Sequence, residues 1–215
     1  MLKVDYFSFV LCVWAFINEK RLEEVEQQLG KDLDIELQFL PNFASVHPKI
    51  EAGWKDRGGF EGYAEHVSEV ADQFDITLHK DAWSSIRPAS SMMAHAYIKA
   101  VQSIHGHLKA REYSLELRKA FFLEAKDISK VAECKTVALS IKIDWEAVAV
   151  YFESGQALSD LNMDFQCAKD YQISVSPAWV FNEGRQKLIG NVGYRVLEVN
   201  LKELISQKPL KQNWC

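Results

Sequence analysis

The order of hydrophobic patterns along the chain is the feature that most constrains its fold. Residues 2–12 alternate and then become continuously apolar, as in a buried strand. The apolar residues of 14–29 then keep helical spacing up to Gly30, which closes the helix in the manner of a C′ glycine. Residues 35–40 alternate with a period of two and stop at Pro41. The chain is therefore predicted to begin as strand, helix and strand.

A long stretch without strand patterns follows this opening. Residues 41–81 contain several glycines and one amphipathic segment over 63–74, which predicts a loop with a single helix. Beyond them, helical patterns cover residues 91–105, 110–124, 129–140, 145–152 and 156–171. Asp144 precedes one of these patterns as a helix N-cap, and Gly155 follows it as a stop. The middle of the chain is predicted to be a block of helices.

Strand patterns return near the end of the chain. Residues 173–181 and 186–190 are predicted to be two strands joined by a turn, and residues 194–205 a helix with one apolar face. The complete order is β-α-β, a helical block, and β-β-α. This order predicts an α/β protein whose small mixed sheet is assembled from both ends of the chain, with the helices inserted between them.

The composition and charge indicate which classes of partner, and which cellular location, are expected for this chain. A chain of 215 residues with 48% hydrophobic residues can bury a sizeable core. Its formal charge of −5 is spread without a basic run, so we expect neither nucleic acid nor an anionic membrane surface as a partner. The apolar start of the chain lacks the charge and cleavage site of a signal peptide, and no segment approaches the roughly 20 apolar residues of a membrane span. We therefore expect a cytoplasmic protein.

Four cysteines, at positions 12, 134, 167 and 215, form no C-x-x-C pair and show no zinc-like spacing. Cys134 and Cys167 lie in apolar helical patterns and are expected to be buried and inert, whereas Cys215 is expected to be exposed. Cys12 lies where the first strand meets the first helix, next to unpaired backbone N–H groups and the positive end of the helix dipole. This position predicts a lowered thiol pKa and a reactive thiolate, with a buried structural thiol as the alternative.

Six histidines raise the question of a metal site, and two of them flank Gly106. Their spacing matches no zinc signature, and no cluster of carboxylates accompanies them. Gly106 marks the end of a helical pattern instead. We expect no metal site and no bound cofactor.

Two motifs and the closing run of the chain resemble the DsbA-like thioredoxin family. Where that family opens its first helix with a Cys-Pro-Trp-Cys-like motif, this chain has FVLCVWA at residues 9–15. Where the family has its cis-proline, this chain has Val175-Ser176-Pro177. The run NEGRQKLIGNVGYR, residues 182–195, is similar to a cytoplasmic, FrnE-like branch of the family.

The resemblance implies a thioredoxin fold with a long all-helical insertion between its β-α-β and β-β-α halves. It assigns residues 1–42 and 172–215 to the thioredoxin-like domain. It assigns residues 43–171 to the inserted helical domain. It also implies Cys12 as the catalytic thiol and Trp14, Ser176 and Pro177 as substrate-binding residues. With Pro177 in the cis form, the preceding backbone turns toward Cys12, so that Ser176 hydrogen-bonds an extended peptide or glutathione.

Two positions depart from the family's motif. Ala15 stands in place of the second, resolving cysteine, and Val13 in place of the proline. A lone Cys12 forms only a mixed disulfide that an outside thiol must resolve, unless Cys134 or Cys167 lies within about 7 Å of it, Cα to Cα. The resemblance therefore predicts a monothiol thiol-disulfide oxidoreductase that acts on protein or glutathione disulfides, with glutathione as co-substrate.

Two other functions stay open. Kappa-class glutathione transferases and the related 2-hydroxychromene-2-carboxylate isomerases share the architecture, hold glutathione as its thiolate at the same helix start and need no resolving cysteine. A catalytically degenerate member would instead bind a partner in the groove between the two domains. Loss of the second cysteine favours this binding protein, whereas retention of Cys12 counts against it.

Overall fold

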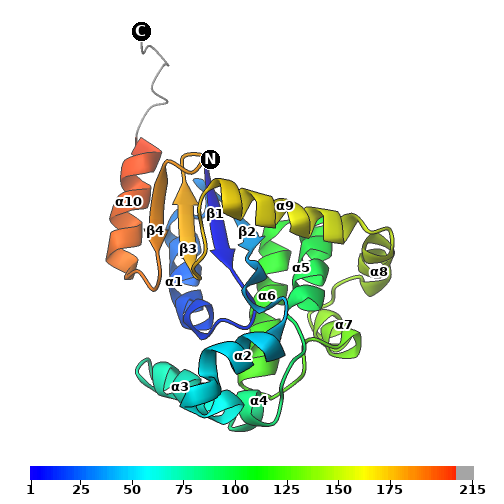
Figure 1. Ribbon diagram of the computed structural model, residues 1–215. Helices are drawn as coiled ribbons and strands as arrows, with labels where there is room; N and C mark the ends of the chain where they lie inside the picture. The colour runs from blue at the N-terminus through cyan, green and yellow to red at the C-terminus, as the bar shows by residue number, and fades with distance from the viewer. Residues whose placement is uncertain (207–215) are drawn as a thin grey trace.

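Four strands from the two ends of the chain form one sheet in the structure, a computed structural model that describes residues 1–206 (Figure 1). They are β1 (Leu2–Ser8), β2 (Leu33–Phe39), β3 (Ala178–Phe181) and β4 (Gln186–Ile189). In the order β2-β1-β3-β4, β1 and β2 are parallel, whereas β3 is antiparallel to β1 and β4 to β3. The predicted thioredoxin-like α/β fold is confirmed.

The first and last helices, α1 (Val13–Leu29) and α10 (Tyr194–Ser206), pack against each other beside this sheet (Figure 1). Of the apolar positions that predicted α1, Ile17, Leu22 and Val25 are buried, whereas Leu29 at its end is half-buried. Gly30 follows α1 as predicted, but its φ of −58° is right-handed, so the C′ role is wrong. Glycine is needed there because a Cβ would lie 2.4 Å from the carbonyl oxygen of Glu26.

The remaining helices of the described chain lie between β2 and β3 in sequence. They are α2 (Val46–Trp54), α3 (Gly59–Asp72), α4 (Asp81–Ser84), α5 (Met92–His105), α6 (His107–Phe122), α7 (Val131–Ser140), α8 (Trp145–Glu153) and α9 (Gln156–Asp170). Two 3₁₀ turns, Pro41–Phe43 and Lys55–Arg57, lie on either side of α2. The five helices predicted between residues 91 and 171 are confirmed. Asp144 is the N-cap of α8, as predicted, and its Oδ1 accepts the Ala147 N–H at 3.3 Å.

The segment of residues 41–81 differs from the predicted loop with one helix, because it contains both α2 and α3 and ends where α4 begins. Gly58 separates α2 from α3 and has a left-handed φ of +84°. Gly62 lies within α3, where a Cβ would come within 1.8 Å of the carbonyl oxygen of Arg57. Its neighbours leave no room for a side chain. The glycines that indicated a loop therefore belong to a tightly packed pair of helices.

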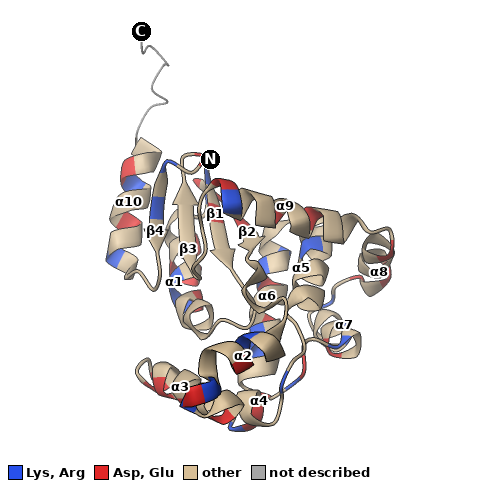
Figure 2. Ribbon diagram, in the orientation of Figure 1, with Lys and Arg blue, Asp and Glu red and all other residues tan. Residues whose placement is uncertain are grey.

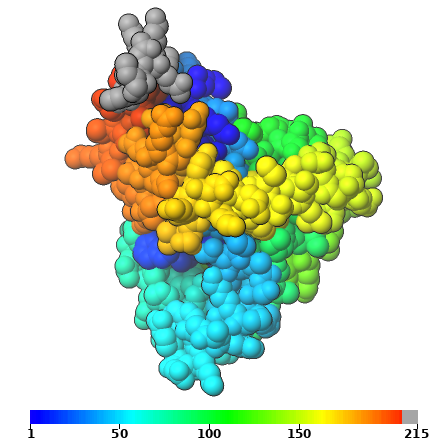
Figure 3. Space-filling model, turned by 45° about the horizontal axis from the view of Figure 1, so that its top comes forward, coloured from blue at the N-terminus to red at the C-terminus, as the bar shows by residue number. Residues whose placement is uncertain are grey.

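One continuous set of buried apolar residues runs from the sheet into the helices. Phe43 joins the two parts, since its ring lies edge-on to Phe9 at 5.3 Å between centroids and packs against Trp83 at 5.4 Å. Helices α2 to α4 lie beyond the end of β1, where α1 begins (Figure 1). In the space-filling view, blue atoms from the start of the chain emerge between the cyan helices and the orange strands (Figure 3).

The strand predicted over residues 173–181 is shorter in the structure. β3 begins only at Ala178, and residues 173–176 form a loop that ends in a cis peptide bond to Pro177. Proline has no N–H to donate to a neighbouring strand, so the ladder starts after it. The chain thus reaches the end of the sheet through an irregular segment rather than a longer strand.

Charged residues of both signs are interspersed over the helices, and neither sign covers a large area in this view (Figure 2). Within residues 1–206, every helix is too short or too polar to cross a membrane.

Candidate active site

The first helix begins at the cysteine that the sequence singled out. Cys12 is the N-cap of α1, with extended backbone angles (φ −88°, ψ 115°), and its sulfur accepts a hydrogen bond from the Ala15 N–H at 3.4 Å. The turn before it is closed by the Cys12 N–H, which donates to the Phe9 carbonyl oxygen at 3.0 Å. The sulfur therefore faces N–H groups that have no partner inside the helix, at the positive end of the helix dipole.

The loop before β3 lies against the same sulfur. The Cys12 S–H donates to the carbonyl oxygen of Ser176 over 3.6 Å, although the two residues are 164 positions apart in sequence. The peptide bond between Ser176 and Pro177 is cis, as predicted. The structure thus brings together three of the four site residues that the sequence selected.

Trp14, the fourth of these residues, occupies the first turn of α1. It is half-buried, and its ring lies edge-on to Phe74 with 5.9 Å between the ring centroids. This contact packs the start of α1 against the segment after α3. Substrate binding by Trp14 stays a prediction.

Burial changes the pKa of the Cys12 thiol more than its position at the start of the helix does. Only 5% of this residue is exposed, and burial raises the pKa of its thiol. The Ser176 side chain, the Ala15 N–H and the Arg118 charge act in the opposite direction. The prediction of a lowered thiol pKa is therefore wrong for this closed site, because a thiolate excluded from water loses its solvation. The sequence pattern did not show how completely distant segments cover the sulfur.

A buried guanidinium lies close enough to the thiol to favour its ionised form. Arg118 of α6 is fully buried and donates from Nη1 to Glu19 Oε1 and Ser114 Oγ, both at 2.7 Å, and from Nη2 to Ser8 Oγ at 2.9 Å. Burial raises the pKa of Glu19, and Arg118 opposes that rise. The sequence analysis missed this group because charged residues within amphipathic helices usually lie on the solvated face.

The other cysteines make separate contacts. Cys134 of α7 is buried, as predicted, and its S–H donates to the Ile128 carbonyl oxygen at 3.3 Å, while burial raises its pKa to about 12. Cys167 of α9 is only half-buried, contrary to the prediction, and burial raises its pKa to about 11. Cys12, Cys134 and Cys167 are all free thiols. Cys215 lies outside the described residues.

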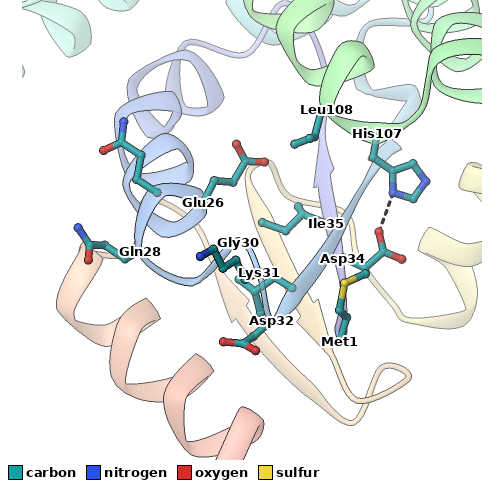
Figure 4. A pocket seen from close by; sticks show the side chains of 12 residues that line it. Met1, Glu26, Gln28, Gly30, Lys31, Asp32, Asp34, Ile35, His107 and Leu108 are labelled. Carbon is teal, nitrogen blue, oxygen red and sulfur yellow. Dashed lines mark hydrogen bonds and ion pairs between the residues drawn. The ribbon is translucent and has the colours of Figure 1, made fainter.

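A cavity of about 680 Å³ lies away from this site (Figure 4). It is lined by the end of α1, the start of β2 and the first turn of α6, where His107 Nδ1 lies 2.9 Å from Asp34 Oδ1. Because β1 and β2 are parallel, the start of β2 is at the opposite end of the sheet from Cys12. Across residues 1–206, no three His, Cys, Asp or Glu side chains are grouped to hold a metal ion.

Comparison with known proteins identifies relatives of this architecture. A thioredoxin family model (Thioredoxin_5) matches residues 7–205. No curated protein matches the chain by sequence. Among solved structures, a putative protein disulfide isomerase from Nitrosomonas europaea has 17% identity and a TM-score of 0.78, over 96% of this chain and 98% of that one.

Two further structures share the fold at similar identity. The cytosolic disulfide reductase DsbM from Pseudomonas aeruginosa is 15% identical with a TM-score of 0.73, over 94% of this chain and 100% of DsbM, and its structure with GSH has a TM-score of 0.69. A 2-hydroxychromene-2-carboxylate isomerase is 15% identical with a TM-score of 0.61, over 94% and 96% of the two chains. At these identities the similarity concerns the fold.

Proposed function

The chain belongs to the thioredoxin family, in its DsbA-like form, and from this premise we propose that it is a thiol-disulfide oxidoreductase of the monothiol type. Cys12 is the reacting thiol, and protein or glutathione disulfides are its substrates. One observation carries the proposal: the Cys12 sulfur lies at the start of α1 and 3.6 Å from the carbonyl oxygen that precedes the cis-proline. Ala15, three residues further on, supplies no second sulfur.

The proposed reaction consists of two thiol-disulfide exchanges. The Cys12 thiolate attacks one sulfur of a disulfide, forms a mixed disulfide with it and releases the other half as a thiolate, which takes up a proton. Because position 15 is alanine, the thiolate of glutathione then attacks the substrate's sulfur in that mixed disulfide. This step releases the Cys12 thiolate and leaves a disulfide between glutathione and the substrate. The fold shared with DsbM, whose structure is known with GSH, supports glutathione as co-substrate.

The loop before β3 is proposed to bind the substrate beside the sulfur. The Ser176 hydroxyl is buried and lies close enough to the Cys12 thiol to lower its pKa, so a bound peptide or glutathione that pairs with this hydroxyl is held beside the sulfur. Pro177 holds the start of β3 next to this position, and the half-buried ring of Trp14 offers an apolar surface on the α1 side.

Intact-mass analysis after exposure to oxidised glutathione tests the proposal. The wild-type chain is expected to gain a glutathione that peptide mapping locates on Cys12 and that reduced glutathione removes. Cys12→Ser/Cys215→Ser is compared with Cys215→Ser, because Cys215 is expected to be exposed and to react whatever its role. The double variant is expected to stay unmodified, because burial raises the pKa values of Cys134 and Cys167 to about 12 and 11. Equal modification of these two variants would contradict the assignment of Cys12.

A second variant tests the monothiol character. The wild-type chain is expected to reduce insulin poorly, since nothing at position 15 can resolve a mixed disulfide. Ala15→Cys is expected to form an internal disulfide with Cys12 and to gain insulin reduction, because a neighbouring thiol has a very high effective concentration. Ala15→Ser serves as the control of similar size. Strong insulin reduction by the wild-type chain would contradict the monothiol mechanism.

Two observations favour other functions at the same site. The fold shared with the isomerase, together with Ala15, favours an enzyme related to kappa-class glutathione transferases, in which glutathione is held beside Cys12 rather than joined to it. The nearly complete burial of Cys12 favours a degenerate binding protein. Calorimetric binding of reduced glutathione without a disulfide adduct would support the first alternative. Absence of both binding and adduct would support the second.

The location and domain division are part of this proposal. DsbM, which shares the fold, is described as cytosolic, and a lone thiol that relies on outside thiols suits a reducing compartment. We propose a cytoplasmic protein of the FrnE-like branch, with residues 1–42 and 172–215 as thioredoxin-like domain and 43–171 as helical insertion. Fractionation of the native host tests the location.

A further inference from the structure

A buried histidine holds the turn that leads into Cys12. His95 of α5 is fully buried, and its Nε2 accepts a hydrogen bond from the Val10 N–H at 2.9 Å. Val10 lies two residues before Cys12, in the turn that the Cys12 N–H closes on the Phe9 carbonyl oxygen. This hydrogen bond spans 85 positions and ties α5 to the junction between β1 and α1.

The surroundings of His95 fix its protonation and its orientation. Burial, together with the charge of Arg118, lowers the pKa of His95 to about 3, so the ring is neutral near physiological pH. A neutral imidazole accepts at one nitrogen and carries its hydrogen on the other. Because Nε2 accepts from Val10, Nδ1 carries the hydrogen. The ring also stacks on Phe39 of β2, with 4.3 Å between the centroids and 14° between the planes.

Without His95, the Val10 N–H would be a buried donor with no acceptor. Val10 is fully excluded from water and lies between the end of β1 and the start of α1, where neither element supplies a regular backbone partner. A buried N–H that loses its acceptor is strongly unfavourable, so the turn is expected to rearrange. Such a rearrangement moves Cys12 from the N-cap position, in which its sulfur accepts the Ala15 N–H.

We propose that His95 is a positioning residue for Cys12: by accepting the Val10 N–H, it fixes the turn that places the sulfur at the start of α1. This inference rests on the proposed function of Cys12 as the reacting thiol. His95 acts through Val10 and takes no proton in the exchange. The charged and titratable groups that interact electrostatically with the thiol are Arg118 of α6, Tyr6 of β1 and Tyr63 of α3.

Three substitutions separate the hydrogen bond from the packing of the ring. His95→Gln keeps an acceptor at about the reach of Nε2 but loses the ring, and His95→Leu loses both. His95→Phe keeps a ring against Phe39 and loses the acceptor. The measured quantity is the apparent pKa of Cys12, obtained from the pH dependence of iodoacetamide alkylation and from ultraviolet thiolate absorbance with Cys12→Ser as baseline. Circular dichroism checks that each variant is folded.

His95→Leu and His95→Phe are expected to raise the apparent pKa of Cys12 by about one unit, which is about a tenfold loss of thiolate at neutral pH. His95→Gln is expected to stay within about twofold of the wild type in thiolate population. If the Phe variant does not fold, Gln and Leu still form a matched pair, since both lack the ring.

Three results would overturn the inference: an unchanged pKa in the Leu variant, an equal shift in the Gln variant, or faster alkylation in the Leu or Phe variant. Faster alkylation would mean that His95 only covers the sulfur. Thiolate absorbance requires no substrate, so this comparison decides the role of His95 independently of turnover. A wild-type chain that forms no glutathione adduct would contradict the proposed function instead.

Discussion

Two buried ion pairs lie where helices of the insertion meet the rest of the molecule, and they differ in what lies beside them. Arg118 of α6 binds Glu19 of α1, with 2.7 Å between Nη1 and Oε1, close to Cys12. Lys99 of α5 binds Asp164 of α9, with 2.9 Å between Nζ and Oδ1, close to the edge strand β2. All four side chains are at most 9% exposed. Both pairs therefore need nearly complete hydrogen bonding to offset the loss of water.

The Lys99–Asp164 pair completes the free edge of β2. Lys99 Nζ donates to the Leu37 carbonyl oxygen at 3.3 Å, and Asp164 Oδ2 accepts the Phe39 N–H at 3.0 Å. These side chains occupy the places of the backbone groups that a neighbouring strand would supply. The Arg118 guanidinium instead bonds two serine hydroxyls, and its charge favours the Cys12 thiolate. The comparison shows that two similar ion pairs have different roles. One pair hydrogen-bonds backbone groups at a sheet edge, and the other places a positive charge beside the reacting sulfur.

Arg118→Met is expected to reduce the free energy of unfolding the most among the variants that test this comparison. It leaves Glu19 buried without a partner, which costs about 3–5 kcal/mol in the free energy of unfolding. The pKa of Cys12 is expected to rise as well, because a favourable charge is lost. Urea denaturation and the pH dependence of alkylation measure the two effects. The double variant Arg118→Met/Glu19→Met is expected to recover stability but not the Cys12 pKa; equal stability of the single and double variants would contradict this account.

Lys99→Met is expected to have a smaller effect, a loss of about 1–3 kcal/mol. The penalty is limited because Asp164, whose pKa is already raised to about 7, can bind a proton when its partner is removed. The apparent pKa of Cys12 is expected to stay unchanged, since no charge near the sulfur is altered. Urea denaturation and alkylation again provide the measurements. A shift of the Cys12 pKa in this variant would remove the distinction between the two pairs.

Asp164→Asn tests the Lys99–Asp164 pair through the pH dependence of the free energy of unfolding. Burial raises the pKa of Asp164 from its ordinary value of 3.8 to about 7, with Lys99 opposing the rise. The folded state therefore binds this proton more tightly than the unfolded state, and the resulting stabilisation is present below about pH 4 and lost as the pH rises through about 7. From about pH 6 to about pH 8, the stability of wild type relative to Asp164→Asn is expected to fall by about 1–2 kcal/mol. Urea denaturation across this range checks it, and a constant difference would contradict the raised pKa.

Hydrophobic spacing predicted the order of elements and the mixed sheet because these depend on local patterns, whereas the resemblance to a known family implied that Cys12 and Pro177 meet. The N-cap position follows from the junction of strand and helix, and the cis-proline loop from the resemblance to a known family. Within residues 41–81, α3 overlaps the predicted amphipathic segment, whereas α2 was missed because the glycines indicated a loop; at Gly62 a close contact requires the glycine, which a linear pattern does not reveal. Such contacts appear only once the chain is folded.

The buried polar groups were missed for a related reason. Glu19 and Arg118 are 99 positions apart, and Val10 and His95 are 85 apart, so neither residue of a pair indicates its partner in the sequence. Burial of Cys12 arises from segments as distant as Ser176. A helix start alone predicted a lowered thiol pKa, whereas the balance between burial and hydrogen bonding depends on these tertiary neighbours.

Ser114→Ala is expected to give the smallest effect at the Arg118 pair. The Ser114 hydroxyl accepts one hydrogen bond from Nη1 at 2.7 Å, while Glu19 and Ser8 keep their bonds to the guanidinium, so the loss in free energy of unfolding is about 1 kcal/mol. The matched control is Ser140→Ala, an exposed serine whose hydroxyl bonds only within its own helix, with an expected change within about 0.5 kcal/mol. Urea denaturation compares the two variants. A loss in Ser114→Ala as large as that of Arg118→Met would show that the hydroxyl, rather than the carboxylate, holds the buried charge in place.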